Sequence, residues 1–196
     1  IYNNLLYENH ATGIALFQQD GNEPSINADI VHNTIINASN ARWCILAVNG
    51  SSGAQVFNNI LINQHAWRGS IALDPDAVTG FDSDYNIVVN SLSNEGDGQA
   101  MTLTEWQALG YDANSMIADP LNELFVIPGS DYHLLNDAQA VDEGSAAFAF
   151  GINEDIEGTA TVRRGDHDLF VRRVRVHFQR ALVGNLGHAP SACTEV

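Results

Sequence analysis

The sequence contains no lysine, and its eight arginines face 24 aspartates and glutamates, which gives a formal net charge of −16. A surface this acidic repels phosphate backbones, so the composition disfavours nucleic acid as a partner. It is compatible with an extracellular or high-salt setting, with divalent cations, and with neutral or cationic ligands.

Cysteine and long apolar runs are also scarce. Cys44 lies in an apolar run and is expected to be a small core residue, and spacing does not reveal whether it pairs with Cys193. No apolar run approaches the length of a membrane span, so no membrane insertion is expected. The sequence has no Gly-rich phosphate loop, no nucleophile elbow and no zinc-type Cys/His spacing.

What the sequence does contain is a repeated apolar run bracketed by asparagines. The copies are Tyr2–Asn9, His32–Asn37, Asn58–Asn63 and Asp84–Asn90. Aligned on the residue before each apolar run, at Asn4, Thr34, Asn59 and Asn86, they lie roughly 30, 25 and 27 residues apart, a period typical of solenoids. Because the chain enters the first copy directly from Ile1, without Met or a signal peptide, we expect further N-terminal coils of a longer chain.

A second apolar run follows each of the first three copies, and these runs contain Ile14, Ile45 and Ile71. Two rows of runs with one period predict coils of two strand segments each, stacked in parallel. Asparagine tolerates the left-handed backbone of a tight corner, and stacked side-chain amides can hydrogen-bond from coil to coil. We place Asn9, Asn37, Asn63 and Asn90 at one such corner.

The periodicity fades after about residue 91, and the remaining chain divides into two parts. Residues 102–109 predict a short helix, with Thr102 or Thr104 as its N-cap and Glu105 in its first turn. We expect coils over 1–100, a cap over 101–169 that covers the open end of the solenoid, and a tail over 170–196. Residues 1–160 hold 21 acids and two arginines, a net charge of −19, whereas residues 161–196 hold six arginines and three acids.

The C-terminal part resembles the closing segment of many secreted bacterial β-helix proteins. The resemblance rests on Trp106–Ser115, Ala118–Leu121, Asp131–Leu134, Ala140–Gly144 and Gly165–Leu169. It implies an all-β fold, the right-handed parallel β-helix of the pectate-lyase-like superfamily, and a strand after Asp119-Pro120. It also implies a secreted or cell-surface protein that binds or processes polysaccharide. Beyond Leu169 the resemblance ends, and residues 170–196 are either a reading-frame artefact or unrelated extension, or an Arg-rich element that binds an acidic partner or the acidic body.

The corner after each Asn-bracketed run gathers the candidate site residues, since stacked coils bring equivalent corners about 4.8 Å apart. We assign candidate catalytic roles to His65, Arg68 and Arg42, with His65 the more suitable base because arginine holds its proton at ordinary pH. Candidate substrate-binding residues are His10, Trp67, Trp43 and Asn40. In the alternative interpretation, the arginines balance local acids and the tryptophans pack under a loop.

A second group consists of the carboxylates Asp74, Asp76, Asp82 and Asp84. Oxygen ligands of this kind suit Ca²⁺, although the spacing is not that of an EF-hand. The alternatives are an acid/base pair and a solvated acidic turn. The triplet Asp166-His167-Asp168 is also metal-compatible, but the resemblance implies a closing turn there.

The resemblance leaves the function class open, because the superfamily includes enzymes and non-catalytic surface or spike proteins. Its lyases use an Arg or Lys base aided by Ca²⁺, and its hydrolases use paired carboxylates. We therefore predict a polysaccharide-binding or polysaccharide-processing protein, with a lyase as the favoured enzyme. The alternative is a structural or adhesion module.

Overall fold

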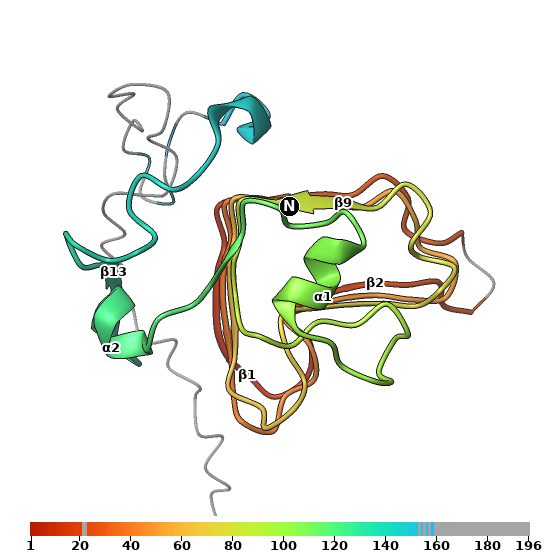
Figure 1. The fold of residues 1–196 in the computed structure, drawn as a ribbon, viewed down its shortest axis with the longest axis horizontal. Coiled ribbons are helices and arrows are strands. Elements are labelled where there is room, and N and C mark those ends of the chain that lie inside the picture. Colours follow the sequence, from red (N-terminus) through yellow and green to blue (C-terminus); the bar gives the residue numbers. More distant parts are fainter. Residues whose placement is uncertain (21–22, 153, 155, 157, 159–196) are drawn as a thin grey trace, which may run out of the picture.

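The computed structural model describes residues 1–20, 23–152, 154, 156 and 158, and in it the chain winds into a parallel β-solenoid (Figure 1). The predicted all-β parallel β-helix is therefore confirmed. The tail at 170–196, Cys193 and the triplet at 166–168 lie outside the described residues. None of the helices in the described part is long and apolar enough to cross a membrane.

The first sheet is built from the Asn-bracketed runs. Its strands, in spatial order, are β1 (Leu5–Asn9), β4 (Thr34–Asn37), β7 (Ile60–Asn63), β10 (Ile87–Val88) and β11 (Met116–Ile117). All neighbours pair in parallel, as predicted. Thr34 pairs with Leu5 and with Ile60, so the alignment on Thr34 was wrong by one residue. The residue equivalent to Asn4 is therefore Asn33. His32 stands at the corner position that Asn3 and Asn58 occupy in the neighbouring coils.

The second sheet contains β2 (Ile14–Leu16), β5 (Ile45–Ala47) and β8 (Ile71–Leu73). Ile14 pairs with Ile45, and Ile45 pairs with Ile71, which confirms the predicted register of the second apolar runs.

A third sheet completes each coil, so the prediction of two strand segments per coil was wrong. Its strands are β3 (Asp29–Val31), β6 (Gln55–Phe57) and β9 (Asp82–Asp84). Each strand has three residues and begins with an exposed or half-exposed polar side chain. Only Ile30 and Val56 of this sheet join the central core. Because each strand contributes at most one apolar residue to that core, these strands lack the longer apolar run that revealed the other two sheets.

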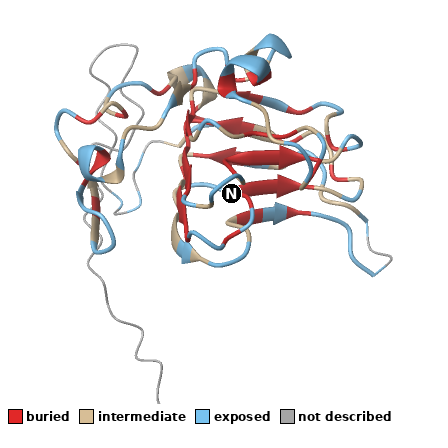
Figure 2. Ribbon diagram, turned by 60° about the horizontal axis from the view of Figure 1, so that its bottom comes forward, coloured by how far each residue is buried: buried red, intermediate tan, exposed pale blue. Residues whose placement is uncertain are grey.

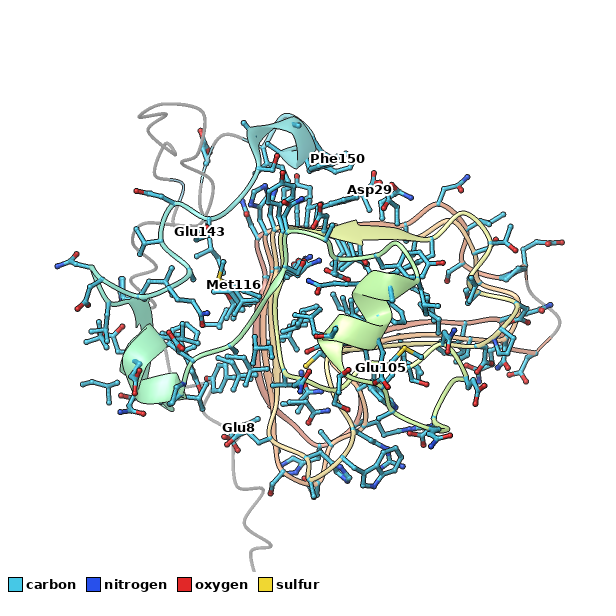
Figure 3. The ribbon with its side chains drawn as sticks, in the orientation of Figure 1. Glu8, Asp29, Glu105, Met116, Glu143 and Phe150 are labelled. Atoms are coloured by element: carbon cyan, nitrogen blue, oxygen red, sulfur yellow. The ribbon has the colours of Figure 1, made fainter. Side chains whose placement is uncertain are left out.

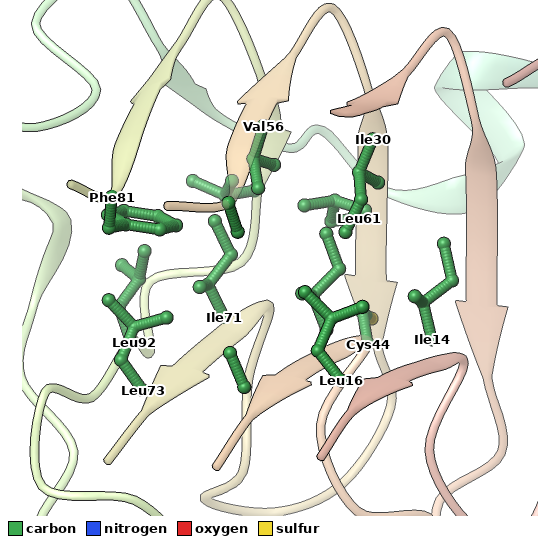
Figure 4. Close-up of a cluster of buried hydrophobic side chains, with 14 of the residues drawn as sticks. Ile14, Leu16, Ile30, Cys44, Val56, Leu61, Ile71, Leu73, Phe81 and Leu92 are labelled. Carbon is green, nitrogen blue, oxygen red and sulfur yellow. The ribbon is translucent and has the colours of Figure 1, made fainter. Parts of the chain in front are cut away.

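The core fills the space inside the coils, and Figure 2 shows the stacked strands as its buried walls. Inward side chains from all three sheets meet there, including Leu16, Ile30, Cys44, Val56, Leu61 and Ile71 (Figure 4). At the C-terminal end, α1 (Leu103–Ala108) adds Leu103 and Trp106 to the same cluster. Thr102 is its N-cap and forms a capping box with Glu105, which confirms one of the two predicted caps.

The described residues after β11 lie beside the coils, and they do not extend over the end that α1 covers. Short helix α2 (Leu121–Leu124) starts where the resemblance implied a strand, and it leads into the antiparallel pair β12 (Phe125–Ile127) and β13 (Asp131–Leu134). Leu124, Phe125 and Tyr132 pack on the outer face of the first sheet. That face is apolar because Ile36, Ile60 and Ile62 point outward, so it needs a cover of its own. Figure 1 shows α1 over the end of the coils and α2 beside them.

An asparagine ladder joins the coils at the corner before the first sheet. The residues just before the ladder have left-handed φ values of 54°, 55°, 56° and 55°, at Asn3, His32, Asn58 and Tyr85. Asn4, Asn33 and Asn59 each donate the backbone N–H and Nδ2 to the Oδ1 of the next ladder asparagine, at 2.9–3.1 Å. The ladder runs from Asn4 through Asn33 and Asn59 to Asn86, in steps of 29, 26 and 27 residues.

The asparagines at the other end of the strands behave differently. Asn9, Asn37 and Asn63 stand in register, as predicted. Their amides do not bond to one another; Asn37 Nδ2 donates to the carbonyl of Trp43 and Asn63 Nδ2 to that of Gly69. They fix the corner that leads into the second sheet.

Candidate functional site

The corner after β4 carries Arg42, and the same corner one coil later carries Arg68. Both side chains converge on Asp97, from the segment that follows the last full coil. Arg68 donates from Nε and Nη2 to the two carboxylate oxygens, at 2.6 and 2.8 Å. Arg42 adds one hydrogen bond of 3.0 Å from Nη2. A carboxylate held in the fork of one guanidinium and touched by a second is strongly oriented.

Trp43 is fully buried beneath the same segment, packed with Leu46 and Ala72. Its Nε1 donates to Asp97 Oδ1 at 2.8 Å, so Asp97 receives hydrogen bonds from three side chains of two coils. This is the arrangement that the alternative interpretation of the corner describes: the arginines balance an acid, and Trp43 packs under a loop.

Asp97 was missed by sequence reasoning, although its position carried a signal. It lies 29 residues after Arg68, which is about one coil length, in a stretch where the apolar pattern had faded. Hydrogen bonding from Arg68, with help from Trp43 and the positive charges of both arginines, lowers the pKa of Asp97 to about 2 against the opposing effect of burial.

This pKa predicts a pH-dependent stabilisation. Because the folded pKa of about 2 lies below the ordinary value of 3.8, the contribution is complete above about pH 4 and is lost as pH falls toward 2. With Asp97 28% exposed, we expect about 1–2 kcal/mol after allowance for solvent screening. Urea unfolding of the wild type and Asp97→Asn should differ by this amount at pH 6, and the difference should shrink by pH 2.5. A difference that stays constant over this range would contradict the assignment.

Trp67 is the exposed aromatic side chain of the corner, with 44% of its surface accessible. The guanidinium carbon of Arg68 lies 4.5 Å from the centre of its ring. Trp43 and His65 approach it edge-on, with centroid distances of 6.2 and 5.5 Å. The indole is therefore held by its neighbours while much of its surface remains open to solvent.

His65 organises the turn that presents Trp67. Its Nδ1 accepts hydrogen bonds from the backbone N–H groups of Trp67 and Arg68, at 3.2 and 3.1 Å. In a neutral imidazole with Nδ1 as acceptor, the proton resides on Nε2. The basic nitrogen of His65 is thus occupied within the turn, and hydrogen bonding to Asp97 raises the pKa of Arg68. The other ring nitrogen, Nε2, lies 3.5 Å from Arg68 Nη1.

The other two predicted binding residues form a separate pair. His10 Nδ1 and Asn40 Oδ1 lie 2.6 Å apart, and both residues are exposed. Within the described part of the chain, no hydrogen bond joins this pair to Trp67, Arg68 or Asp97.

Three of the four carboxylates proposed for Ca²⁺ accept hydrogen bonds, from different parts of the chain. Asp74 and Asp76 accept hydrogen bonds from the backbone N–H groups of Asn49 and Gly50. Asp82 and Asp84 belong to strand β9 rather than to a loop. Asp84 binds the backbone and side-chain N–H groups of Asn114, at 2.6 and 2.7 Å. Among the described residues, no group of three or more His, Cys, Asp or Glu side chains is placed to hold a metal ion. Ca²⁺ binding by these four residues therefore stays a prediction.

A second acid that sequence reasoning missed is Asp112, which is fully buried. Its oxygens accept hydrogen bonds from Ser83, Asn86, Trp106 and Ser115, at 2.5–2.9 Å. Burial raises the pKa of the Asp112 carboxyl, and these four hydrogen bonds oppose that effect. Asp112 closes the C-terminal end of the asparagine ladder and ties α1 to it, so its role is structural.

No protein-family model, curated protein or solved structure matches this chain. The parallel β-helix rests on the strand pairing itself, and the pectate-lyase-like superfamily stays a prediction.

Proposed function

We propose that this protein binds carbohydrate and that the exposed indole of Trp67 is the contact surface. The observation that carries the proposal is an aromatic ring 44% exposed yet fixed by Arg68, His65 and Trp43. A flat ring that is already ordered loses little conformational entropy when the apolar face of a sugar stacks on it. Arg42, whose side chain is 49% exposed, presents further N–H donors beside it for hydroxyl groups.

The geometry favours binding over bond cleavage. A lyase of the superfamily needs a base, and Arg68 is committed to Asp97 through two hydrogen bonds. His65 uses its basic nitrogen within its own turn. The proposal therefore places the protein among secreted or cell-surface β-helix proteins that recognise polysaccharide, as a surface or adhesion module.

The ligand class follows from the charge. The body of the protein carries many more acids than arginines, and such a field repels a long polyanion. Two arginines and one aspartate leave the corner itself with a local charge of +1. Neutral polysaccharides are therefore the favoured ligands.

Replacing Trp67 by alanine tests the proposal. We expect binding to a responsive polysaccharide, measured by affinity electrophoresis and calorimetry, to weaken at least about tenfold, which corresponds to about 1.4 kcal/mol. Phe17→Ala is the matched control, because Phe17 is 42% exposed on a different part of the surface. Equal retention of the ligand by both variants would contradict the role of Trp67.

The same polysaccharides, with uronate polymers added, should be assayed for unsaturated products by absorbance, with and without chelator. Product formation would replace the binding proposal with the lyase alternative. Binding without product would support the module.

A further inference from the structure

His65 is a half-buried histidine in contact with the exposed indole of Trp67. Its Nδ1 accepts hydrogen bonds from the backbone N–H groups of Trp67 and Arg68, at 3.2 and 3.1 Å, and its ring lies edge-on to the indole. Its own backbone N–H donates to Asn63 Oδ1 at 3.0 Å, which fixes the start of the turn. The turn that presents Trp67 is therefore held by one imidazole nitrogen acting as an acceptor.

A protonated imidazole cannot serve as this acceptor. Histidine changes charge between about pH 5 and 8, and in its charged form both ring nitrogens are donors. A proton on Nδ1 faces the N–H groups of Trp67 and Arg68, so both hydrogen bonds of the turn are lost. The second nitrogen offers no compensation, because Nε2 lies 3.5 Å from the guanidinium of Arg68, which is already positive.

The charged groups beside His65 keep their charges over the same pH range. In the described part of the chain, no carboxylate is hydrogen-bonded to the imidazole. Asp97, from the segment after the last full coil, is held by Arg68 and Arg42 instead. Because the pKa of Asp97 is lowered to about 2, this group of charges does not change near neutral pH.

Other titratable groups at this end of the first sheet face elsewhere. Figure 3 shows Glu8 on the outer side of that sheet, where its charge adds to the effect of burial in raising the pKa of Tyr132. His10 Nδ1 lies 2.6 Å from Asn40 Oδ1, and within the described residues no hydrogen bond joins this pair to Trp67. The response of the Trp67 turn to pH therefore falls on its own imidazole.

We propose that His65 is a positioning residue that makes carbohydrate binding by Trp67 dependent on pH. The neutral imidazole holds the turn and keeps the indole fixed, which is the binding form. As pH falls, protonation of Nδ1 replaces an acceptor with a third donor, the turn opens, and the indole loses its fixed orientation. Affinity falls with the fraction of protein in the binding form, so the ligand is held near neutral pH and released in mildly acidic surroundings. This inference rests on the proposed role of Trp67.

Acrylamide quenching of tryptophan fluorescence follows the turn without any ligand. Of the three tryptophans, Trp43 and Trp106 are fully buried, so the quencher reports on Trp67. We expect the quenching constant of the wild type to rise between pH 7.5 and pH 5.5. In His65→Asn it should stay level, because the asparagine Oδ1 can accept the same N–H groups and does not titrate. Far-UV circular dichroism at both pH values checks that the coils remain folded.

Affinity for a responsive polysaccharide is measured on the same proteins at the same two pH values. We expect wild-type affinity to be about tenfold lower at pH 5.5 than at pH 7.5, the change that follows when only the neutral histidine is competent. For His65→Asn this ratio should fall below about twofold. His65→Ala, which has no acceptor, should bind as weakly at pH 7.5 as the wild type does at pH 5.5. His10→Asn is the matched control, since His10 is an exposed histidine in the same row of corners, and it should keep the wild-type ratio.

The outcomes separate the role of His65 from the carbohydrate ligand. A wild-type quenching constant that stays level, or one that rises equally in His65→Asn, would overturn the role of His65 whether or not carbohydrate binds. An affinity ratio that His65→Asn preserves would overturn it as well. A quenching response confined to the wild type and His10→Asn, with no polysaccharide retained at pH 7.5, would support the release of the turn and overturn the carbohydrate ligand.

Discussion

Replacing Asn59 by aspartate is expected to lower the free energy of unfolding by about 3–5 kcal/mol, the range for a buried charge left without a partner. Asn59 is completely buried. Its Nδ2 donates to the carbonyls of Ile30 and Phe57, at 2.8 and 2.9 Å, and to Asn86 Oδ1 at 3.0 Å. Aspartate has nearly the same shape but places an oxygen against these three acceptors, so it reverses the polarity of one ladder step.

Urea unfolding measures this effect, and a second variant separates its causes. Asn59→Ala removes the hydrogen bonds without adding charge, and we expect a smaller loss of about 2–4 kcal/mol, because buried donors and acceptors remain unpaired. Asn122, exposed in α2, provides the control: Asn122→Ala should change stability by less than about 0.5 kcal/mol. If Asn59→Asp costs less than the alanine variant, the donor role assigned to Nδ2 is wrong.

Replacing Asp112 by alanine is expected to cost about 3–5 kcal/mol, because four donors lose their common acceptor inside the protein. Neither the indole N–H of Trp106 nor the amide of Asn86 can become an acceptor at that position. The loss falls on the contact between α1 and the end of the ladder, so amides of α1 should lose hydrogen-exchange protection together with those of β10.

Asp112→Asn distinguishes hydrogen bonding from charge. The NH₂ group of the new asparagine must face one of the four donors, which costs stability. Removal of the buried charge offsets part of that cost. We therefore expect the free energy of unfolding to fall by an intermediate amount, about 2–3 kcal/mol. The exposed residue Asp137 offers a matched control, and Asp137→Asn should be close to neutral. An Asp112→Asn protein as stable as the wild type would show that the four hydrogen bonds contribute little beyond the cost of burying the carboxylate.

Local and periodic features of this protein were predictable. The spacing of Ile14, Ile45 and Ile71 predicted one of the sheets in its true register. The α1 cap was predictable because Thr102 and Glu105 interact within four residues of chain. The third sheet was not, since its strands contribute a single inward residue per coil.

The sequence by itself determined that the coils stack. Apolar runs repeat at intervals of 26–31 residues, and a repeated run buries its side chains against its own copies. The tertiary structure alone decided which polar residues have structural roles. Asp97 and Asp112 stand in stretches without periodicity, and their partners come from earlier coils, 26–55 residues away, or from their own turn. A carboxylate is positioned by the donors that converge on it in space, and neighbours along the chain do not reveal that convergence.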